Sequence, residues 1–253
     1  MLVDVVGTGM VAHAFGTIAT DVPAAIICAS GVADSETADT SAFRRERELL
    51  MTLTRQARET HSILVYFSGA PVYGDCSRLR IETGPATPRT PYGWHKLDCE
   101  RLVAGSGARY LILRLPNVVG SAGHPRQLVP SLITQAMAGS VVVRIDATRD
   151  LLDVDDLVAI TADLLRCGAA DAILNVASGV STAVPRLVEH IGSILGVAPA
   201  VTLVDGGDRQ EFSIAMAREL LPTYPRFTDS YPMEVLVRRV PSICRSMAER
   251  LLL

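Results

Sequence analysis

The sequence predicts an α/β fold built on a parallel sheet. Short apolar runs alternate along the chain with longer segments of helical periodicity, and the first apolar run is followed at once by a glycine turn. Apolar residues make up 49% of the 253 residues and charged residues 20%, a balance that suits one or two globular units with a proper core. Strands that alternate with helices in this way are typical of βαβ units.

The first part of the chain contains three such strands. Residues 1–6 and 24–29 are apolar and too short for helices, so each is expected to be a buried strand. A helix is expected between them, over about 10–20. Leucine and alanine recur at helical spacing over 41–61, and the apolar run at 63–67 is again a strand.

The alternation continues to about residue 204. A loop broken by three prolines precedes a helix over 92–104, which is followed by a strand at 110–115. By the same criteria, further helices are expected at 128–138, 154–167 and 184–195, and further strands at 141–145, 172–176 and 201–204.

Two units are expected. The segment after Pro116 is looser and richer in glycine, so the first unit spans 1–117 and is completed by about 153–178. The second unit comprises 118–152 and 179–253. Residues 205–230, mixed in charge and rich in proline, are expected to form a surface of this second unit.

Charge and cysteine content exclude several classes of protein. The net charge is −3 and no run of five like charges occurs, so the sequence lacks the clustered positive charge that binds nucleic acid. A small polar or anionic partner is favoured instead. The five cysteines form no C-x-x-C pair and are expected to be reduced, mostly packed thiols, and no metal site is expected. No apolar stretch approaches the roughly 20 residues that span a bilayer, and the N-terminus lacks a signal-peptide pattern. A cytosolic protein without a membrane partner is expected.

The first chemical motif lies between the first strand and the first helix. Residues 7–12 read Gly-Thr-Gly-Met-Val-Ala, a G-x-G-x-x-A pattern. Glycines at these positions allow a tight turn and the close approach of a pyrophosphate, while the alanine allows close helix packing. Alone the pattern is weak, because an ordinary strand-to-helix turn can look the same.

The second motif pairs Tyr92 with Lys96 near the start of a helix that follows Pro91. Residues at i and i+4 lie on one face of a helix, so the ammonium can lower the pKa of the phenol and hydrogen-bond a cofactor ribose. Tyrosine needs such help to act as a base near pH 7. Every other cation of the Lys and Arg class in this chain is arginine, which makes a chance lysine at this position less credible.

These motifs, with four others, give the chain a resemblance to the extended short-chain dehydrogenases/reductases, specifically the NAD-dependent epimerase/dehydratase group that acts on nucleotide sugars. The further motifs are YFSGAPVYG at 66–74, LRLPNVVG at 113–120, RDLLDVDD at 149–156 and NVASG at 175–179. The resemblance implies a Rossmann-like doubly wound sheet with a small C-terminal substrate-binding lobe. The first unit would be the dinucleotide-binding domain, and the second the substrate-binding lobe.

The resemblance also implies roles for individual residues. Tyr92 would be the acid/base and Lys96 its partner on the nicotinamide ribose of NAD or NADP. The cofactor would be lined by Gly7, Gly9, Met10, Val11, Ala12, Ala29, Ser30, Phe67, Tyr92, Lys96 and Leu115. The substrate would be bound by Asn117 and Arg149 at its diphosphate and by Gln127 and Leu128 at its base. A surface ion pair of Arg149 with Asp150 or Asp153 is the alternative.

The chain departs from the family in three respects. Gly69 stands where the family's usual catalytic Ser or Thr falls, so Ser68 is the candidate hydroxyl, with a packing role as its alternative. Ala70 and Pro71 replace the Asp-Glu pair of the 4,6-dehydratases, which disfavours dehydration. Two βα units are missing after the first helix, so the sheet is expected to lack strands on one side and the residue that selects NAD or NADP is absent. The third departure, after the one at residues 69–71 and the missing units, is a glycine turn one residue tighter than the family's usual turn.

Three readings of function remain open. The leading one is a 4-keto-sugar reductase with Tyr92 as acid/base, and the second is a nucleotide-sugar 4-epimerase with tightly bound NAD. The third is a non-catalytic NAD(P)-binding regulator, motivated by Gly69. The resemblance further implies a homodimer formed through the helix with Tyr92 and the helix at 41–61.

Two charged groups are expected to be structural. Arg44, Arg45 and Arg47 are interpreted as a solvated helix face rather than as cofactor ligands. The aspartates of the 153–156 segment are interpreted as caps of the helix that begins near Val154 rather than as metal ligands.

Overall fold

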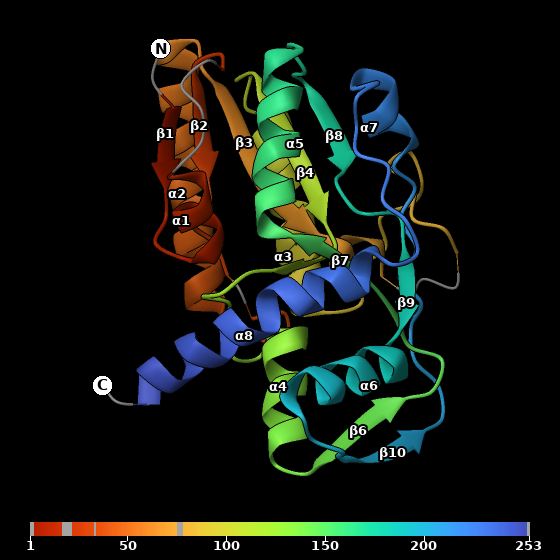
Figure 1. The fold of residues 1–253 in the computed structure, drawn as a ribbon. Helices are drawn as coiled ribbons and strands as arrows, with labels where there is room; N and C mark the ends of the chain where they lie inside the picture. Colours follow the sequence, from red (N-terminus) through yellow and green to blue (C-terminus); the bar gives the residue numbers. More distant parts are fainter. Residues whose placement is uncertain (1–2, 17–21, 33, 75–77, 252–253) are drawn as a thin grey trace.

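The computed structural model describes residues 3–16, 22–32, 34–74 and 78–251. Its main sheet has five strands, all parallel, in the order β1-β2-β3-β4-β8 (Figure 1). The strands are β1 (Val3–Val6), β2 (Ala25–Cys28), β3 (Ile63–Gly69), β4 (Tyr110–Leu115) and β8 (Ala172–Asn175). The predicted α/β class with a parallel sheet is confirmed.

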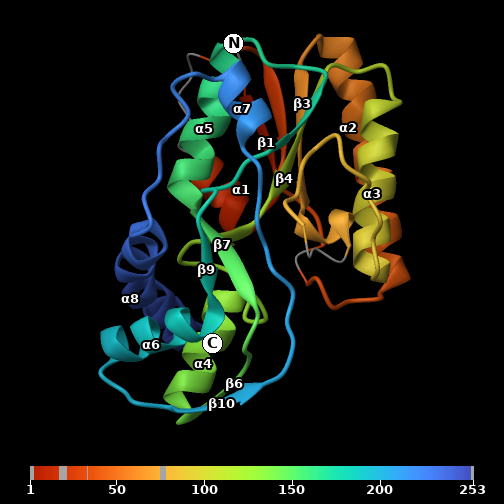
Figure 2. The ribbon, with the colours of Figure 1, turned by 90° about the vertical axis from the view of Figure 1, so that its right-hand side faces the viewer.

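Helices cover both faces of the sheet. Figure 2 shows α1 (Met10–Phe15) and α5 (Val154–Arg166) on one face, and α2 (Thr40–Thr60) and α3 (Pro91–Ala104) on the other. This sandwich explains why the strands read as continuous apolar runs, since a strand buried on both faces needs no polar alternation.

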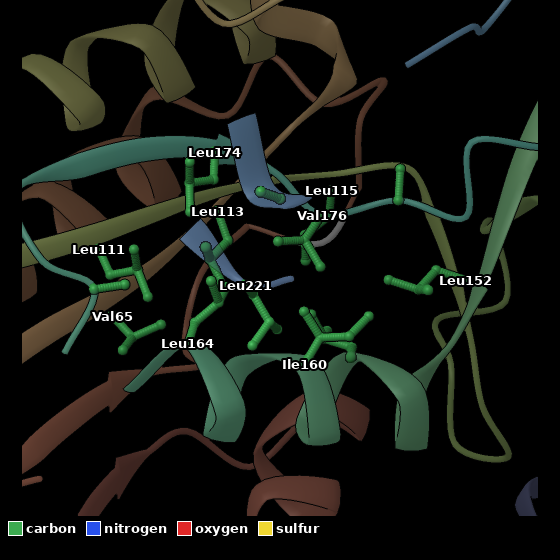
Figure 3. Close-up of a cluster of buried hydrophobic side chains, with 14 of the residues drawn as sticks. Val65, Leu111, Leu113, Leu115, Leu152, Ile160, Leu164, Leu174, Val176 and Leu221 are labelled. Carbon is green, nitrogen blue, oxygen red and sulfur yellow. The ribbon is translucent and has the colours of Figure 1, made fainter. Parts of the chain in front are cut away.

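Each face of the sheet has its own apolar cluster. In Figure 3, Ile160 and Leu164 of α5 lie among strand residues that include Leu113. On the opposite face, Leu50 and Leu53 of α2 pack with Leu64, Tyr66, Val103 and Ile112. Burial of such side chains stabilises the fold by about 1.5–3 kcal/mol each, so the sheet gives the residues at its carboxyl edge a rigid support.

The sheet is shortened in the predicted way. Among the described residues, β1 is an edge strand, and the next described strand after α1 is β2, which pairs with β1 from Val3 opposite Ala25 to Val6 opposite Cys28. No described strand lies beyond β1, which agrees with the expected loss of βα units after the first helix.

A second group of elements lies beyond the carboxyl ends of the main strands (Figure 1). It contains a parallel pair of strands, three helices and an apolar cluster of its own. The elements are β6 (Ser140–Arg144), β10 (Ala200–Val204), α4 (Leu128–Met137), α6 (Val184–Leu195) and α8 (Tyr231–Leu251). Between the two groups lies a small sheet of β5 (Asn117–Val119), β7 (Thr148–Asp153) and β9 (Ser181–Ala183).

One part of the expected unit boundary needs correction. Within the 205–230 segment, Phe212, Leu221 and Tyr224 belong to the apolar cluster of the main sheet, and α7 (Ala215–Leu220) contacts β8. This segment therefore packs on the first unit instead of forming only a surface of the second. The division into two units otherwise stays a prediction.

The interpretations of two charged groups, as a helix cap and as a solvated helix face, agree with the structure. Asp153 caps α5 by accepting a hydrogen bond from the Asp155 amide, and Arg239 pairs with Asp153. Arg44, Arg45 and Arg47 are exposed on α2. Of the cysteines, Cys28 and Cys99 are buried free thiols, Cys244 is half-buried and Cys167 is exposed; Cys76 lies outside the described residues.

In the part of the chain that the structure describes, no helix is both long enough and apolar enough to cross a bilayer.

Candidate functional site

A cavity of about 460 Å³ lies at the carboxyl ends of the main strands, facing the second group of elements. It is lined by the residues that follow β2, by the end of β3 and by residues 115–120 after β4. Ligands of open α/β sheets bind at this edge. The cavity walls include every predicted site residue except Gly7, Gly9 and Ala12: they contain Met10, Val11, Ala29, Ser30, Phe67, Ser68, Tyr92, Lys96, Leu115, Asn117, Gln127, Leu128 and Arg149.

The glycine turn is closely fitted on one side and open on the other. Gly7 has a φ of +139°, and a Cβ there would lie 2.5 Å from the carbonyl oxygen of Ala29, so only glycine fits. Gly9 immediately precedes α1, and a Cβ on it would meet no described atom within 4 Å. The turn therefore leaves room for a bound group near the start of α1.

Tyr92 and Lys96 come from the first two turns of α3. Thr90 caps this helix by accepting a hydrogen bond from the Gly93 amide, with Pro91 at the first helical position. Gly93 has no room for a side chain, because its Cβ would lie 2.6 Å from the carbonyl oxygen of Pro71. The Lys96 Nζ atom lies 5.7 Å from the centre of the Tyr92 ring. The structure thus brings the predicted pair to one wall of the cavity.

Sequence reasoning missed Glu46, a buried carboxylate on α2. Its Oε1 atom accepts hydrogen bonds from Lys96 Nζ at 2.8 Å and from the Tyr66 hydroxyl at 3.0 Å. Its Oε2 atom accepts from the Val32 amide at 2.8 Å and lies 3.0 Å from His95 Nε2. A signal for it exists, since Glu46 occupies the same helical stripe as the buried Leu50, Leu53 and Ala57, where a charge is unexpected.

These contacts determine the charges at the site. Burial raises the pKa of Glu46, but the Lys96 ammonium and the hydrogen bonds outweigh it and lower the pKa to about 2. Burial lowers the pKa of Lys96, but Tyr92 and Glu46 raise it above its ordinary value. The pair is therefore ionised.

The phenol behaves differently from the sequence-based expectation. Burial raises the pKa of Tyr92, Lys96 lowers it, and Glu46 raises it, with a net upward shift. The ammonium acts in the predicted direction, but burial and the neighbouring carboxylate outweigh it. Tyr92 is therefore protonated at neutral pH.

Of the two residues at the end of β3, Ser68 has a hydroxyl group that a ligand could engage and Gly69 has none. The Ser68 hydroxyl is buried and has no hydrogen-bond partner among the described residues, although Ser68 lines the cavity. An orphaned buried hydroxyl at a cavity wall suits contact with a bound group. Gly69 is extended, with a φ of −159°, and lines the cavity without a hydroxyl.

Asn117 and Arg149 face the cavity from the small middle sheet. The Arg149 guanidinium pairs with Asp208 at 2.9 Å and donates to the carbonyl oxygen of Thr148. Its partner is thus Asp208 rather than Asp150 or Asp153. Asn117 donates from Nδ2 to the side chain of Gln210 at 2.8 Å. Gln127 precedes α4, and Leu128 begins it.

One group of described residues has the composition of a metal site. Glu46, His95 and Cys99 offer ligand atoms within 4.8 Å of one another. However, the Lys96 ammonium already binds the Glu46 carboxylate, and a second cation beside it would be repelled. This cluster is better described as an ion-pair network.

The model of the NAD dependent epimerase/dehydratase family matches residues 12–177. GDP-6-deoxy-D-mannose reductase of Pseudomonas aeruginosa is 30% identical over 157 residues, which cover 56% of this chain and 52% of that protein. dTDP-6-deoxy-L-talose 4-dehydrogenase (NAD(P)(+)) of Kitasatospora kifunensis is 28% identical over 205 residues, or 72% of this chain and 62% of that protein. The chain thus matches little more than half of these relatives' length.

Solved structures share the fold. The structure of RMD from Pseudomonas aeruginosa complexed with NADPH superimposes with a TM-score of 0.71 at 24% identity, covering 91% of this chain and 84% of that one. At this identity the likeness concerns the fold, which it identifies as Rossmann-like.

Proposed function

The chain belongs to the NAD dependent epimerase/dehydratase family, and from this we propose that it is an NAD(P)-dependent oxidoreductase acting on a nucleotide-linked sugar. The observation that carries the proposal is the position of Tyr92 and Lys96 in a cavity that Met10 and Val11 of the glycine turn and Asn117 and Arg149 also line. Groups for a dinucleotide, for a reacting oxygen and for an anionic substrate thus converge on one space.

The described residues fit a nicotinamide dinucleotide. The open space at Gly9 and the orphaned Ser68 hydroxyl are both free to meet a bound group. Gly7, Gly9 and Ala12 would hold the pyrophosphate, while Ala29, Ser30, Phe67 and Leu115 would line the rest of the cofactor. When bound, the nicotinamide supplies or accepts a hydride.

The chain's own residues carry the proton and the position of the sugar. Tyr92 would give its proton to the reacting sugar oxygen, and Lys96 would bind the cofactor ribose with the proton that Glu46 and the Phe67 carbonyl oxygen leave free. Arg149 and Asn117 would bind the diphosphate, because a guanidinium forks onto phosphate oxygens. Gln127 and Leu128 would contact the base.

Among the reactions of this class, we favour reduction of a 4-keto sugar. Two observations support this direction. A phenol that is protonated at neutral pH is ready to donate a proton, as reduction requires. The relative with the higher identity of the two named above is a reductase, while the other is named for oxidation at the 4-position.

A non-catalytic cofactor-binding role is the second candidate, and Gly69 favours it, because this position in the cavity wall has no hydroxyl for the reacting oxygen. A single experiment separates the two. Purified protein is incubated with reduced dinucleotide and a panel of 4-keto-6-deoxy nucleotide sugars, and dinucleotide oxidation is followed. Turnover that Tyr92→Phe abolishes supports the reductase. Dinucleotide binding without turnover on any substrate of the panel favours the regulator, and 4-epimerised product with NAD retained favours the epimerase.

A homodimer is part of the proposal. Helices α2 and α3 lie side by side on one face of the sheet (Figure 2). Their outer surface carries Met51 and Trp94, which are 54% and 48% exposed. Exposed apolar side chains of this size suit a contact between two copies.

A further inference from the structure

Glu46 lies in the same cavity wall as Tyr92 and Lys96 but has no part in the proposed reaction. It is 4% exposed and comes from α2, whereas its cation comes from α3. A buried carboxylate is costly unless it is fully paired. The contact of Glu46 with Lys96 suggests that this cost is offset by a role in positioning the ammonium.

Four donors from three segments fix the carboxylate. The Val32 amide comes from the loop after β2, the Tyr66 hydroxyl from β3, and His95 and Lys96 from α3. A Cβ on Gly31 would lie 2.8 Å from Oε1, so the glycine there makes room for the carboxylate. Each oxygen thus has two partners, and the carboxylate has no alternative position of equal hydrogen bonding.

The carboxylate in turn fixes the ammonium. Lys96 Nζ donates to Oε1 at 2.8 Å and lies 3.4 Å from the carbonyl oxygen of Phe67. These two contacts engage two of its three protons and leave one for a ligand in the cavity. A lysine side chain is otherwise flexible, so this arrangement removes the rotational freedom that ligand binding would have to restrict.

The charge of Glu46 also reaches Tyr92. The groups that act on the phenol are Lys96 and Cys99 on the same helix, Glu46 on α2, and Asp34 in the loop after β2, which is itself paired with Arg126. Among them Lys96 is the single cation, and Glu46 lies against it at 2.8 Å. The carboxylate therefore offsets part of the field of the ammonium at the phenol.

We propose that Glu46 is a positioning residue, which holds the Lys96 ammonium in place and offsets part of its charge, and which thereby acts with burial to favour the phenol form of Tyr92, the form that donates a proton in ketone reduction. The inference rests on the proposed function, because it specifies the direction in which that site is poised. Reduction adds an electron pair and hydrogen from the reduced nicotinamide to the carbonyl carbon, and the proton of Tyr92 to the carbonyl oxygen. Tyr92 is left as a phenolate and regains its proton from solvent.

The test titrates the phenol itself. Near-ultraviolet phenolate absorbance of the protein is followed against pH, and the trace of Tyr92→Phe is subtracted to isolate Tyr92. The same subtraction is made in the Glu46→Gln background and in that of the matched control Glu48→Gln, an exposed glutamate of the same helix. Removing the carboxylate leaves the ammonium uncompensated, so Glu46→Gln is expected to lower the midpoint of Tyr92 by about 1–3 pH units, and Glu48→Gln is expected to leave it unchanged. An unchanged or raised midpoint in Glu46→Gln overturns the proposal.

A second pair of variants covers failure of Glu46→Gln to fold, since this substitution leaves a buried cation without its counterion. Lys96→Met is compared with Lys96→Met/Glu46→Gln, in which no charge of the pair remains. The carboxylate acts on the phenol through its charge, so the midpoint of Tyr92 is expected to be lower in the double variant than in Lys96→Met. Equal midpoints contradict the proposal.

Neither titration needs a dinucleotide or a sugar. If the Tyr92 midpoint moves as expected and no substrate is reduced, the proposed function fails while Glu46 keeps its role. If reduction occurs and the midpoint does not move, the role of Glu46 fails alone.

Discussion

The Lys96 ammonium lies 5.7 Å from the centre of the Tyr92 ring and 2.8 Å from the Glu46 carboxylate. The ammonium therefore lies near both the proposed acid, Tyr92, and its ionised counterion, Glu46. In the proposed reaction this geometry assigns the proton to Tyr92 and the orientation of the ribose to Lys96.

Replacement of Tyr92 by phenylalanine should remove turnover and spare cofactor binding. Loss of a general acid costs about 10²- to 10⁴-fold in rate, whereas the ring itself remains. Initial rates of ketone reduction and a fluorescence titration with NADH and NADPH measure the two effects. Tyr110→Phe, outside the cavity, is the control. Full turnover in Tyr92→Phe would rule out the assigned acid.

Gly69→Ser should raise the rate of reduction. The backbone is extended there, and a Cβ would make ordinary contacts with Pro71 Cδ at 3.5 Å and with the Leu115 carbonyl oxygen at 3.7 Å, so a serine fits. Its hydroxyl would offer the reacting oxygen a hydrogen bond. Gly69→Ala separates the effect of the hydroxyl from that of the methylene. If both variants match the parent rate, another group already binds this oxygen.

Ser68→Ala tests whether that other group is Ser68. Its orphaned hydroxyl is expected to bond a ligand, so the substitution should lower the rate by about tenfold, the equivalent of one hydrogen bond of about 1.4 kcal/mol. The loss should be smaller in the Gly69→Ser background, where a second hydroxyl is present. A wild-type rate in Ser68→Ala would indicate that this serine only packs.

Arg149→Gln should raise the KM for the nucleotide sugar by about tenfold or more and leave the affinity for NADH and NADPH unchanged. Hydrogen bonds from a guanidinium to an anion contribute about 1.5–3 kcal/mol. Arg149 reaches the cavity, while the exposed Arg144 on β6 does not, so Arg144→Gln serves as the control. Weakened dinucleotide binding in Arg149→Gln would indicate that Arg149 contacts the cofactor instead of the nucleotide sugar.

The Glu46–Lys96 pair should make stability depend on acid pH. The pKa of Glu46 is lowered to about 2 in the fold from an ordinary value of 4.5. The ionised carboxylate therefore stabilises the fold above pH 4.5, and this contribution of about 3 kcal/mol is lost as the pH falls toward 2. Urea unfolding at several pH values should show a flatter dependence in Glu46→Gln than in Glu48→Gln. Parallel curves for the two variants would contradict an ionised, buried Glu46.

The main sheet was predictable from sequence because its strands are buried on both faces. Runs such as residues 110–115 are short and show neither helical spacing nor strict alternation of apolar and polar residues, which is typical of a strand buried on both faces. The strands β5 and β9 have only three residues each, too few for any periodicity. No helix was predicted over Tyr231–Leu251, where the structure has α8 with Pro241 inside it, although proline disfavours a helix interior.

The site was predictable only where its residues share a motif. Tyr92 and Lys96 are four residues apart, and their spacing alone brings them to one helix face. Glu46 and Lys96 are 50 residues apart, and Arg149 and Asp208 are 59 apart, so tertiary packing decides both pairs. The helical stripe of α2 marks Glu46 as a buried charge, but no local pattern reveals that its partner is Lys96.

The dimer is tested by light scattering on the eluting protein. The expected result is a mass of two chains, with Met51→Glu shifting it toward one, because a charge would be buried on the outer face of α2. A single-chain mass for the parent protein would contradict the proposed dimer.

Cofactor content tests the central claim most directly. Freshly purified protein is denatured, any released nicotinamide nucleotide is identified, and native protein is titrated with NADH and NADPH by fluorescence. The account predicts little retained nucleotide and reversible binding of a reduced dinucleotide. Stoichiometric NAD that does not exchange would contradict the reductase and favour an epimerase, and no binding of either dinucleotide would contradict the oxidoreductase itself.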